Sequence, residues 1–326
     1  MDWLCEAIFP FCFKTFKLNH CMASSPLLVT VVITCYNHGE YLSEAIESVL
    51  KQTYTPVEII VVDDGSTDNT KEVASRYSGI QYVYQSNQGL SAARNTGADH
   101  SSRDCILFLD ADDWLLPQAL SINVQYLEKN REAAFVSGAF KVLKMESNEE
   151  ILMQTAVSDN HYNRLLEFNY ISMHATVLYR RWVFNEFKFD TSLKACEDYD
   201  FYLRVARKYP VLHHTEFIAV YRFHDLNMSY DTVKMMNASI AVIKKQESYL
   251  HNEAEKTSYK KGIKNFKLFY CKVVYAKYLL PKQKNNPNRS FEIKMLWQNS
   301  KAFYFRFYVK KFYQALKNFY KRDESE

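Results

Sequence analysis

Residues 27–39 read Leu-Leu-Val-Thr-Val-Val-Ile-Thr-Cys-Tyr-Asn-His-Gly, an apolar run rich in β-branched residues that ends in turn-forming residues. A short, continuous run of this kind is typical of a strand buried on both faces of a parallel sheet. Apolar residues then recur at spacings of three and four from Leu42 to Leu50, which predicts an amphipathic helix. Residues 27–50 therefore predict one strand–helix unit of an α/β fold.

The same alternation of strand and helix patterns continues as far as residue 109. Pro56 interrupts the first helical pattern, and Ser66, Thr67 and Asp68 are suitable N-cap residues for the second helix. The expected elements are strands at 57–62, 80–84 and 105–109 and helices at 69–77 and 90–98. This order predicts an α/β fold built on a Rossmann-like, doubly wound, mostly parallel sheet.

Beyond residue 109 the alternation loosens, and the chain divides into three parts. We expect an N-terminal extension over residues 1–23, a main domain over 24–230, and a basic, aromatic helical tail over 231–326. The later elements expected in the main domain are strands at 133–140, 174–179 and 211–220 and a helix at 198–208.

The net charge of +4 is distributed unevenly along the 326 residues. Residues 255–322 contain 18 Lys and Arg but only two acids, Glu255 and Glu292, so this segment carries +16 and the rest of the chain −12. Such asymmetry predicts that the tail contacts an anionic partner, either a membrane surface or nucleic acid. No known nucleic-acid-binding module is recognisable, so we expect no nucleic acid and favour a membrane surface.

The sequence contains no apolar run of the roughly eighteen residues that a membrane-spanning helix needs. Trp3–Phe16 is apolar and aromatic but too short to span, and it lacks the basic front and cleavage site of a secretory signal. It is either an interfacial segment or an upstream extension, if translation begins at Met22. The seven cysteines are scattered and form no CxxC pair, which predicts reduced thiols in a cytoplasmic protein.

An acidic cluster, Asp110-Ala-Asp-Asp113, comes directly after the strand expected at 105–109. In open α/β sheets ligands bind at the carboxyl ends of the strands, so these carboxylates are expected at a ligand site. They repel one another unless a cation joins them, and Mg²⁺ or Mn²⁺ prefers carboxylate oxygens and bridges to substrate phosphates. The alternative is an acidic turn that caps the helix after Pro117.

A second cluster, Asp63-Asp-Gly-Ser-Thr-Asp68, follows the strand expected at 57–62. The carboxylate of Asp64 could accept hydrogen bonds from a nucleobase or ribose, whereas Ser66 and Asp68 are as readily explained as helix caps. Tyr36, at the exit of the first strand, could stack on a base through its ring face or serve only in packing.

Four motifs at predicted strand exits occur together in this chain. They are Thr34-Cys-Tyr-Asn37, Val62-Asp-Asp-Gly-Ser66, Asn87-Gln-Gly-Leu-Ser-Ala-Ala-Arg-Asn95 and Phe108-Leu-Asp-Ala-Asp-Asp113. In identity, order and spacing the set closely resembles glycosyltransferase family 2, the large inverting family with the A-type nucleotide-sugar-binding fold. The resemblance covers about residues 27–230 and implies that residues 24–230 are the catalytic domain.

On the donor side, the resemblance implies that Tyr36 lies against the base, that Asp64 bonds the edge of the base, and that Arg94 lies near the diphosphate. It also implies a Mn²⁺ or Mg²⁺ ion at Asp112 and Asp110. His224, after Tyr221-Arg-Phe223, would be a third metal ligand or a phosphate donor, with a structural histidine as the alternative. The residues assigned to the donor nucleotide are Thr34, Tyr36, Asn37, Asp64, Arg94 and Asp110.

On the acceptor side, Cys196-Glu-Asp-Tyr-Asp200 resembles the family's Glu-Asp motif, whose Asp takes the proton from the acceptor hydroxyl. That position is Asp198. For the acids on either side of Asp198, the alternative is a helix start, where carboxylates offset the N-terminal dipole. His174 could line the acceptor pocket, and the sequence assigns no role to His213 or His214.

The resemblance therefore implies inverting transfer of a sugar from a nucleoside-diphosphate donor, with a UDP-sugar expected, to a saccharide or lipid-linked acceptor. Polysaccharide biosynthesis at the cell envelope would be the setting. One rival is a nucleotidyltransferase, which would need a Gly-rich loop after the first strand; residues 36–40 contain one glycine. Another rival is an inactive nucleotide-sugar-binding protein of the same fold. The intact acidic motifs argue against it.

The tail shows aromatic residues at helical spacing with lysines interleaved. The first group is Phe266, Phe269, Tyr270, Val273 and Val274, and the second is Phe305, Phe307, Tyr308, Phe312 and Tyr313. This pattern predicts a basic amphipathic helix on an anionic bilayer, at the inner face of the cell membrane. The alternative is a helix that packs on the catalytic domain and leaves its basic face in water.

Overall fold

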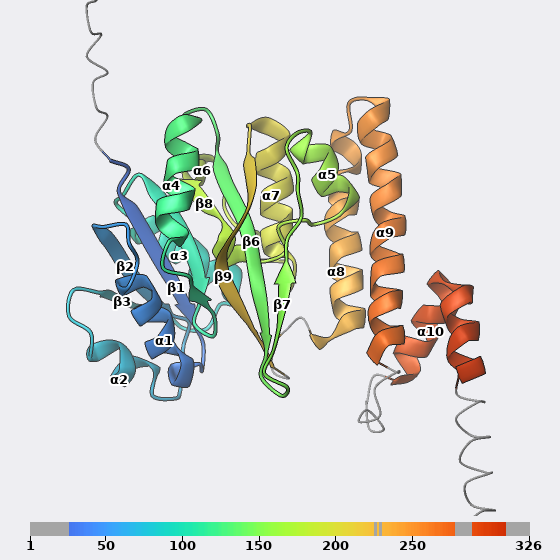
Figure 1. The fold of residues 1–326 in the computed structure, drawn as a ribbon, viewed down its shortest axis with the longest axis horizontal. Helices are drawn as coiled ribbons and strands as arrows, with labels where there is room; N and C mark the ends of the chain where they lie inside the picture. Colours follow the sequence, from blue (N-terminus) through green and yellow to red (C-terminus); the bar gives the residue numbers. More distant parts are fainter. Residues whose placement is uncertain (1–25, 225–226, 228–229, 278–288, 311–326) are drawn as a thin grey trace, which may run out of the picture.

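The protein is described from a computed structural model, which covers residues 26–224, 227, 230–277 and 289–310. These residues form a mixed sheet with helices on both faces and helices at the C-terminal side (Figure 1). The strands are β1 Val29–Cys35, β2 Val57–Asp63, β3 Gln81–Tyr84, β4 Cys105–Asp110, β5 Trp114–Leu115, β6 Phe135–Lys144, β7 Glu149–Met153, β8 Leu178–Arg180 and β9 Leu212–Phe223.

The helices alternate with the early strands and then follow one another in the tail. They are α1 Gly39–Leu50, α2 Thr70–Ser75, α3 Leu90–His100, α4 Ala119–Lys129, α5 His161–Glu167, α6 Val183–Glu186, α7 Glu197–Lys208, α8 Thr232–Lys245, α9 Glu253–Lys277 and α10 Arg289–Asn299. Residues 301–310 are also helical. The expected α/β class and the helical tail are both confirmed.

The strands that carry the four motifs are parallel neighbours. The sheet order among the described residues is β3-β2-β1-β4-β8-β6-β9-β5, with β7 paired to β6. β1, β2, β3 and β4 are parallel, and β8 runs antiparallel between β4 and β6. The carboxyl ends of β1, β2 and β4 therefore meet at one edge, which places the motif residues there.

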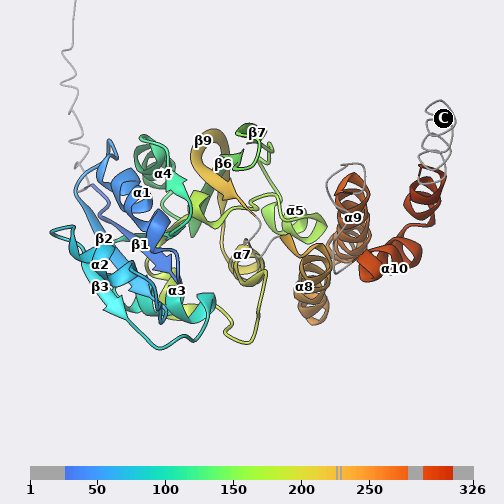
Figure 2. The same ribbon diagram turned by 90° about the horizontal axis from the view of Figure 1, so that it is seen from below.

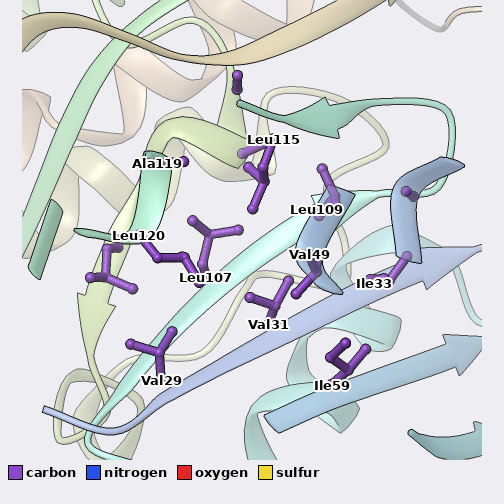
Figure 3. Close-up of a cluster of buried hydrophobic side chains, with 14 of the residues drawn as sticks. Val29, Val31, Ile33, Val49, Ile59, Leu107, Leu109, Leu115, Ala119 and Leu120 are labelled. Atoms are coloured by element: carbon purple, nitrogen blue, oxygen red, sulfur yellow. The ribbon is translucent and has the colours of Figure 1, made fainter. Parts of the chain in front are cut away.

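Alternate side chains of the central strands fill two hydrophobic layers. Val31 and Ile33 of β1 pack in the layer covered by α1 and α4, and Figure 3 shows them beside Leu109 of β4. Val32 points to the opposite face, where α3 and α7 cover the sheet. Figure 2 shows α1 and α4 on one side of β1 and α3 on the other. The continuous apolar run predicted such burial on both faces.

One expected strand is shorter than its sequence suggests. The pattern predicts a strand over 174–179, but His174–Thr176 is a 3₁₀ turn (η1) and β8 begins only at Leu178. The hydroxyl of Thr176 donates to the carbonyl of Met173 at 2.8 Å, and Val177 N donates to the carbonyl of His174 at 3.0 Å. These local bonds favour the turn over an extended chain.

The tail helices α8 and α9 share a core with the main domain. Val242, Ile243 and Phe266 belong to the same buried cluster as the inner face of α7. At Gly262, helix α9 lies so close to α5 that a Cβ atom would collide with the carbonyl oxygen of Leu166. The inner face of α9 thus packs on the catalytic domain.

Some sequence predictions concern residues that the structure does not describe, and others concern the cysteines and membrane-spanning helices. The N-terminal extension, including Trp3–Phe16, lies outside, as do Phe312 and Tyr313. Cys35, Cys105, Cys196 and Cys271, the cysteines inside the described ranges, are all free. Among the described helices, none combines the length and apolar character needed to cross a bilayer.

Candidate active site

The loops after β1 and β2 are tied together by side-chain hydrogen bonds. Asn37 adopts a left-handed conformation with φ of 54°, its N–H donates to Ser66 Oγ at 2.9 Å, and its Oδ1 accepts from Thr67 N at 2.8 Å. Gly39 N donates to Asp68 Oδ2 at 2.9 Å. Asn37 and Asp68 thus shape the loop that presents Tyr36, which is 49% exposed.

Asp64, the residue after β2, is buried against the loop that precedes α3. Its carboxylate accepts hydrogen bonds from Gln85 Nε2 at 2.7 Å, Gln88 N at 2.9 Å and Gly89 N at 2.8 Å. Of the four acceptor positions of a carboxylate, these occupy three, so one on Oδ2 is left. Bonding to a nucleobase therefore stays a prediction, and the structure adds a role in holding the Asn87–Asn95 motif against β2.

Asp110 and Thr34, both assigned to the donor nucleotide, lie in direct contact at the ends of β4 and β1. Thr34 Oγ1 donates to Asp110 Oδ1 at 2.8 Å. Arg94 Nη2 donates to both carboxylate oxygens of Asp110, at 3.1 and 3.2 Å. These charge-assisted bonds hold the carboxylate of Asp110 in a fixed position beside Asp112, the second acid of its motif.

Arg94 joins the donor-side motif to the acceptor-side motif, a connection that no sequence pattern predicted. While Nη2 bonds Asp110, Nη1 donates to Glu197 Oε1 at 2.6 Å, across 103 residues of sequence. The side chain is only 2% exposed. A buried arginine between two carboxylates keeps all three charged groups in fixed positions, because removing any one leaves an uncompensated charge. Contact with a diphosphate stays a prediction for Arg94.

Asp112 lies in a small polar cluster with His224, the residue that follows β9. Asp112 Oδ2 is 3.2 Å from His224 Nε2, 3.2 Å from Asn227 Nδ2 and 4.0 Å from His38 Nδ1. The ring of Tyr41 stacks on that of His224 with centroids 5.7 Å apart. Burial, together with the negative charge of Asp110, raises the pKa of Asp112.

The contact between Asp112 and His224 fits the separation of two neighbouring ligands of an octahedral cation. With bonds of about 2.1 Å at right angles, two such ligands lie about 3.0 Å apart. No group of three or more metal-binding side chains gathers within the described residues. Two protein ligands are nevertheless compatible with Mg²⁺, which usually keeps several waters and is bound through substrate phosphates. His38 and Asn227 were not predicted, although His38 stands in the exit loop of β1.

Arg222 and Asp113 hold the acidic turn in place. Arg222 N donates to Asp113 Oδ1 at 2.9 Å, and Arg222 Nε donates to the carbonyl of Asp112 at 2.9 Å. The guanidinium also pairs with Glu44 of α1 and lies over the rings of Tyr41 and Trp114. Burial raises the pKa of Asp113 well above its usual value. These residues support the site rather than face a ligand.

Asp198 stands at the first turn of α7, partly exposed. Burial, reinforced by the charge of Glu197 and opposed by Arg94, raises its pKa to about 7. The neighbouring acids are engaged elsewhere: Glu197 by Arg94, and Asp200 by Arg204 Nε and Lys245 Nζ, each at 2.7 Å. The structure therefore distinguishes Asp198 from the two acids beside it.

Of the three remaining histidines, His174 and His214 are buried and His213 is half-buried. His174 is buried among Phe108, Phe189 and Tyr202, and burial lowers its pKa well below the usual value. His213 lies 2.8 Å from the hydroxyl of Ser137, and His214 lies 2.8 Å from Asn123 Oδ1. Burial lowers the pKa of both to about 4, so all three are neutral near pH 7.

Comparison with known proteins identifies the family. The profile described as Glycosyl transferase family 2 matches residues 30–226. GlyA of Streptococcus pneumoniae serotype 4 is 44% identical over 91 residues, which are 27% of this chain and 13% of GlyA. An uncharacterised glycosyltransferase of Rickettsia felis is 31% identical over 183 residues, 55% of this chain and 30% of that protein. The chain thus spans less than a third of either relative.

Solved structures show the same fold at low sequence identity. TarS 1-349 of Staphylococcus aureus in complex with UDP-GlcNAc matches with a TM-score of 0.60, 15% identity, and coverage of 83% of this chain and 80% of that one. The mannosyltransferase PcManGT of Pyrobaculum calidifontis, in complex with GDP-Man and Mn²⁺, matches with a TM-score of 0.57, 16% identity, and coverage of 89% and 88%.

Proposed function

The chain belongs to glycosyl transferase family 2, and from that membership we propose that it transfers a sugar from a nucleoside-diphosphate donor to an acceptor hydroxyl with inversion. The observation that carries the proposal is the separation of two carboxylates with different environments. Asp112 faces His224 at the carboxyl end of β4, whereas Asp198 opens α7 with its pKa raised to about 7. Direct displacement needs both, one group on each side of the reacting carbon.

In this reaction Asp198 accepts the proton of the acceptor hydroxyl while the hydroxyl oxygen bonds to the anomeric carbon of the sugar and the bond from that carbon to the diphosphate breaks. A base is most effective when its pKa is close to the working pH, and the raised pKa of Asp198 meets that requirement. Arg94 holds Glu197, the residue before Asp198, and Asp110 at fixed positions. Mn²⁺ or Mg²⁺ bound at Asp112 and His224 would offset the charge of the departing diphosphate.

For the donor, a UDP-sugar is the first choice. Tyr36 offers an exposed ring at the exit of β1, and base–aromatic stacking tolerates any base, so the ring alone selects no nucleotide. TarS was solved with UDP-GlcNAc and PcManGT with GDP-Man, and the same sheet edge in this chain would hold such a donor. The acceptor is a saccharide or a lipid-linked saccharide.

The remaining alternative is a protein that binds the donor without transferring the sugar. A panel of nucleotide sugars in Mn²⁺, scored for release of the nucleoside diphosphate with and without saccharide acceptors, separates the two. Transfer requires release that depends on Mn²⁺ and on Asp198. Binding of a donor by calorimetry without any release, in every acceptor condition, would leave the binding protein as the better account.

A further inference from the structure

The tail consists of two parts that differ in how their apolar residues are used. In α9, Phe266 and Val274 face inward against the main domain and α8. In the distal tail, which we define as residues 289–310, Met295, Leu296 and Phe307 are buried in a small cluster with Cys271 and Val274 of α9. That cluster fixes which sides of the two distal helical segments face outward.

The outward sides of the distal tail carry large apolar side chains. Side chains of this size are seldom exposed together on a soluble surface without a partner. Their exposed fractions are 63% for Phe291, 47% for Trp297, 56% for Phe305, 41% for Tyr308 and 58% for Val309. Phe305 and Val309 also line a shallow hollow of about 430 Å³ together with Tyr275 of α9.

Positive charge lies on the same segment. Lys294, Lys301, Arg306 and Lys310 are exposed in the distal tail and Arg289 is half-buried there, against a single acid, Glu292, which is buried. Exposed aromatic rings interleaved with lysine and arginine on one surface are typical of helices that lie in the headgroup region of an anionic bilayer. A second copy of this chain would present the same positive charge, which disfavours self-association through this surface.

The position of the distal tail is consistent with such contact. In Figure 1, α10 lies beside the end of α9 that is nearest the ends of β6 and β9. His224 follows β9 and contacts Asp112, so the candidate site lies toward the same end of the molecule. A bilayer against the distal tail would therefore lie toward the end of the molecule that carries the candidate site.

We propose that residues 289–310 dock the protein on an anionic membrane surface through Phe291, Trp297, Phe305 and the neighbouring lysines. This goes beyond sugar transfer and does not depend on it. The full chain is mixed with vesicles of phosphatidylglycerol and phosphatidylcholine, or of phosphatidylcholine alone, and the bound fraction is measured by sedimentation. Binding should need the anionic lipid and weaken with salt.

Two variants test the surface itself. Lys294→Gln with Lys301→Gln should lower the partition coefficient about 25-fold, because each basic residue near such a surface contributes about fivefold. Phe305→Ser with Val309→Ser should lower it about tenfold. The matched controls are Lys71→Gln with Lys129→Gln, also exposed, and Leu50→Ser, which is 55% exposed on α1; both should bind like the wild type.

A direct readout comes from Trp297, whose fluorescence should be quenched by brominated acyl chains, with Trp297→Phe removing that signal. Wild-type binding by both distal-tail variants would overturn the proposal and move the contact elsewhere, for example to residues 1–23. Dimerisation through this surface, or binding to homopolymeric RNA but not to vesicles, would also overturn it. Donor affinity should be equal in all variants, so failure here is distinct from failure of the transferase function.

Discussion

The two acidic regions of the candidate site differ in the groups that surround their carboxylates. At the donor side, the carboxylate of Asp110 is held in place by hydrogen bonds from Thr34 and Arg94. At the acceptor side, Asp198 has a partly desolvated carboxylate beside a second acid, and its pKa rises to about 7. The roles proposed for the two aspartates follow from this difference: a positioned carboxylate at the donor side and a proton acceptor near neutral pH at the acceptor side.

The two regions also differ in how they are built. The donor side is assembled from loops that follow adjacent parallel strands, so its parts meet wherever the sheet forms. The acceptor side depends on contacts between distant segments: α7 is held by Lys245 of α8 and by Arg94 of α3. Four substitutions test whether these differences matter, taken from the largest expected effect to the smallest.

Asp112→Asn should abolish transfer while the fold is retained. A metal ion contributes several kcal/mol of charge stabilisation at the leaving group, and Asp112 is the proposed ligand beside His224. Titration of the donor in Mn²⁺ should show weaker, metal-independent binding. Asp159→Asn, an exposed acid, is the control. Full activity of Asp112→Asn, or of the wild type in chelator, would rule out the metal site.

Asp198→Asn should lower the transfer rate by about 10²–10⁴-fold, the typical contribution of a general base, with donor affinity unchanged. If donor affinity falls in step with the rate, Asp198 belongs to the donor side, and the two acidic regions do not have separate roles in donor and acceptor binding. If the rate is near that of the wild type, Glu197 or Asp200 must be the base.

The same residue predicts two pH dependences of opposite direction. Activity should rise tenfold per pH unit below about pH 7 and then level off, because only the ionised carboxylate accepts a proton. Stability should fall as pH rises from about 4 to 7, because the folded protein holds a proton that an unfolded aspartate has already lost near its usual pKa of 3.8. Thermal unfolding of Asp198→Asn should lack that fall.

Arg94→Met should cost about 3–5 kcal/mol of unfolding free energy, because it leaves the buried carboxylate of Glu197, and that of Asp110, which is 32% exposed, without their counter-charge. Adding Glu197→Gln should recover part of the loss. Lys188→Met, which breaks an exposed pair with Asp99, should change it by only about 0–1 kcal/mol. Equal denaturation midpoints for Arg94→Met and Lys188→Met would show that the two regions are not linked through Arg94.

Tyr36→Ala should lower nucleotide affinity by about 1–3 kcal/mol, the usual contribution of a stacked base, as measured by calorimetry. Tyr36→Phe keeps the ring and should bind like the wild type. Unchanged affinity in the alanine variant would mean that the ring takes no part in donor binding.

Sequence reasoning was most successful where function follows from local position. The run from residue 27 to 39 predicted β1 and its exit loop, and the Asp110–Asp113 motif was expected, correctly, at the end of β4. The four motifs also identified the family, which the family profile confirms over residues 30–226. Each of these stretches, taken singly, contains at most 13 consecutive residues.

It failed where a residue acts through a distant partner. Nothing near Arg94 in the sequence indicates that it pairs with Glu197, and nothing near Asn37 indicates that it bonds the loop after β2. The strand expected over 174–179 gave way to η1 because hydroxyl and backbone bonds favoured a turn. The aromatic residues of α9 have the spacing of a membrane-surface helix, but spacing alone does not reveal that Phe266 is buried while Phe269 is 41% exposed, and membrane contact of this helix stays a prediction.

The close approach of α9 to α5 at Gly262 determines where segments of such a chain can be recombined, in evolution or by design. Residues 231–277 must be inherited together with the sheet, because their side chains complete its core and position 262 admits no side chain. A recombination junction placed at the end of the family match, near residue 226, would separate α7 from Lys245. A junction after Lys277 leaves the core intact, so new distal segments can be joined there to redirect the same catalytic domain to other surfaces.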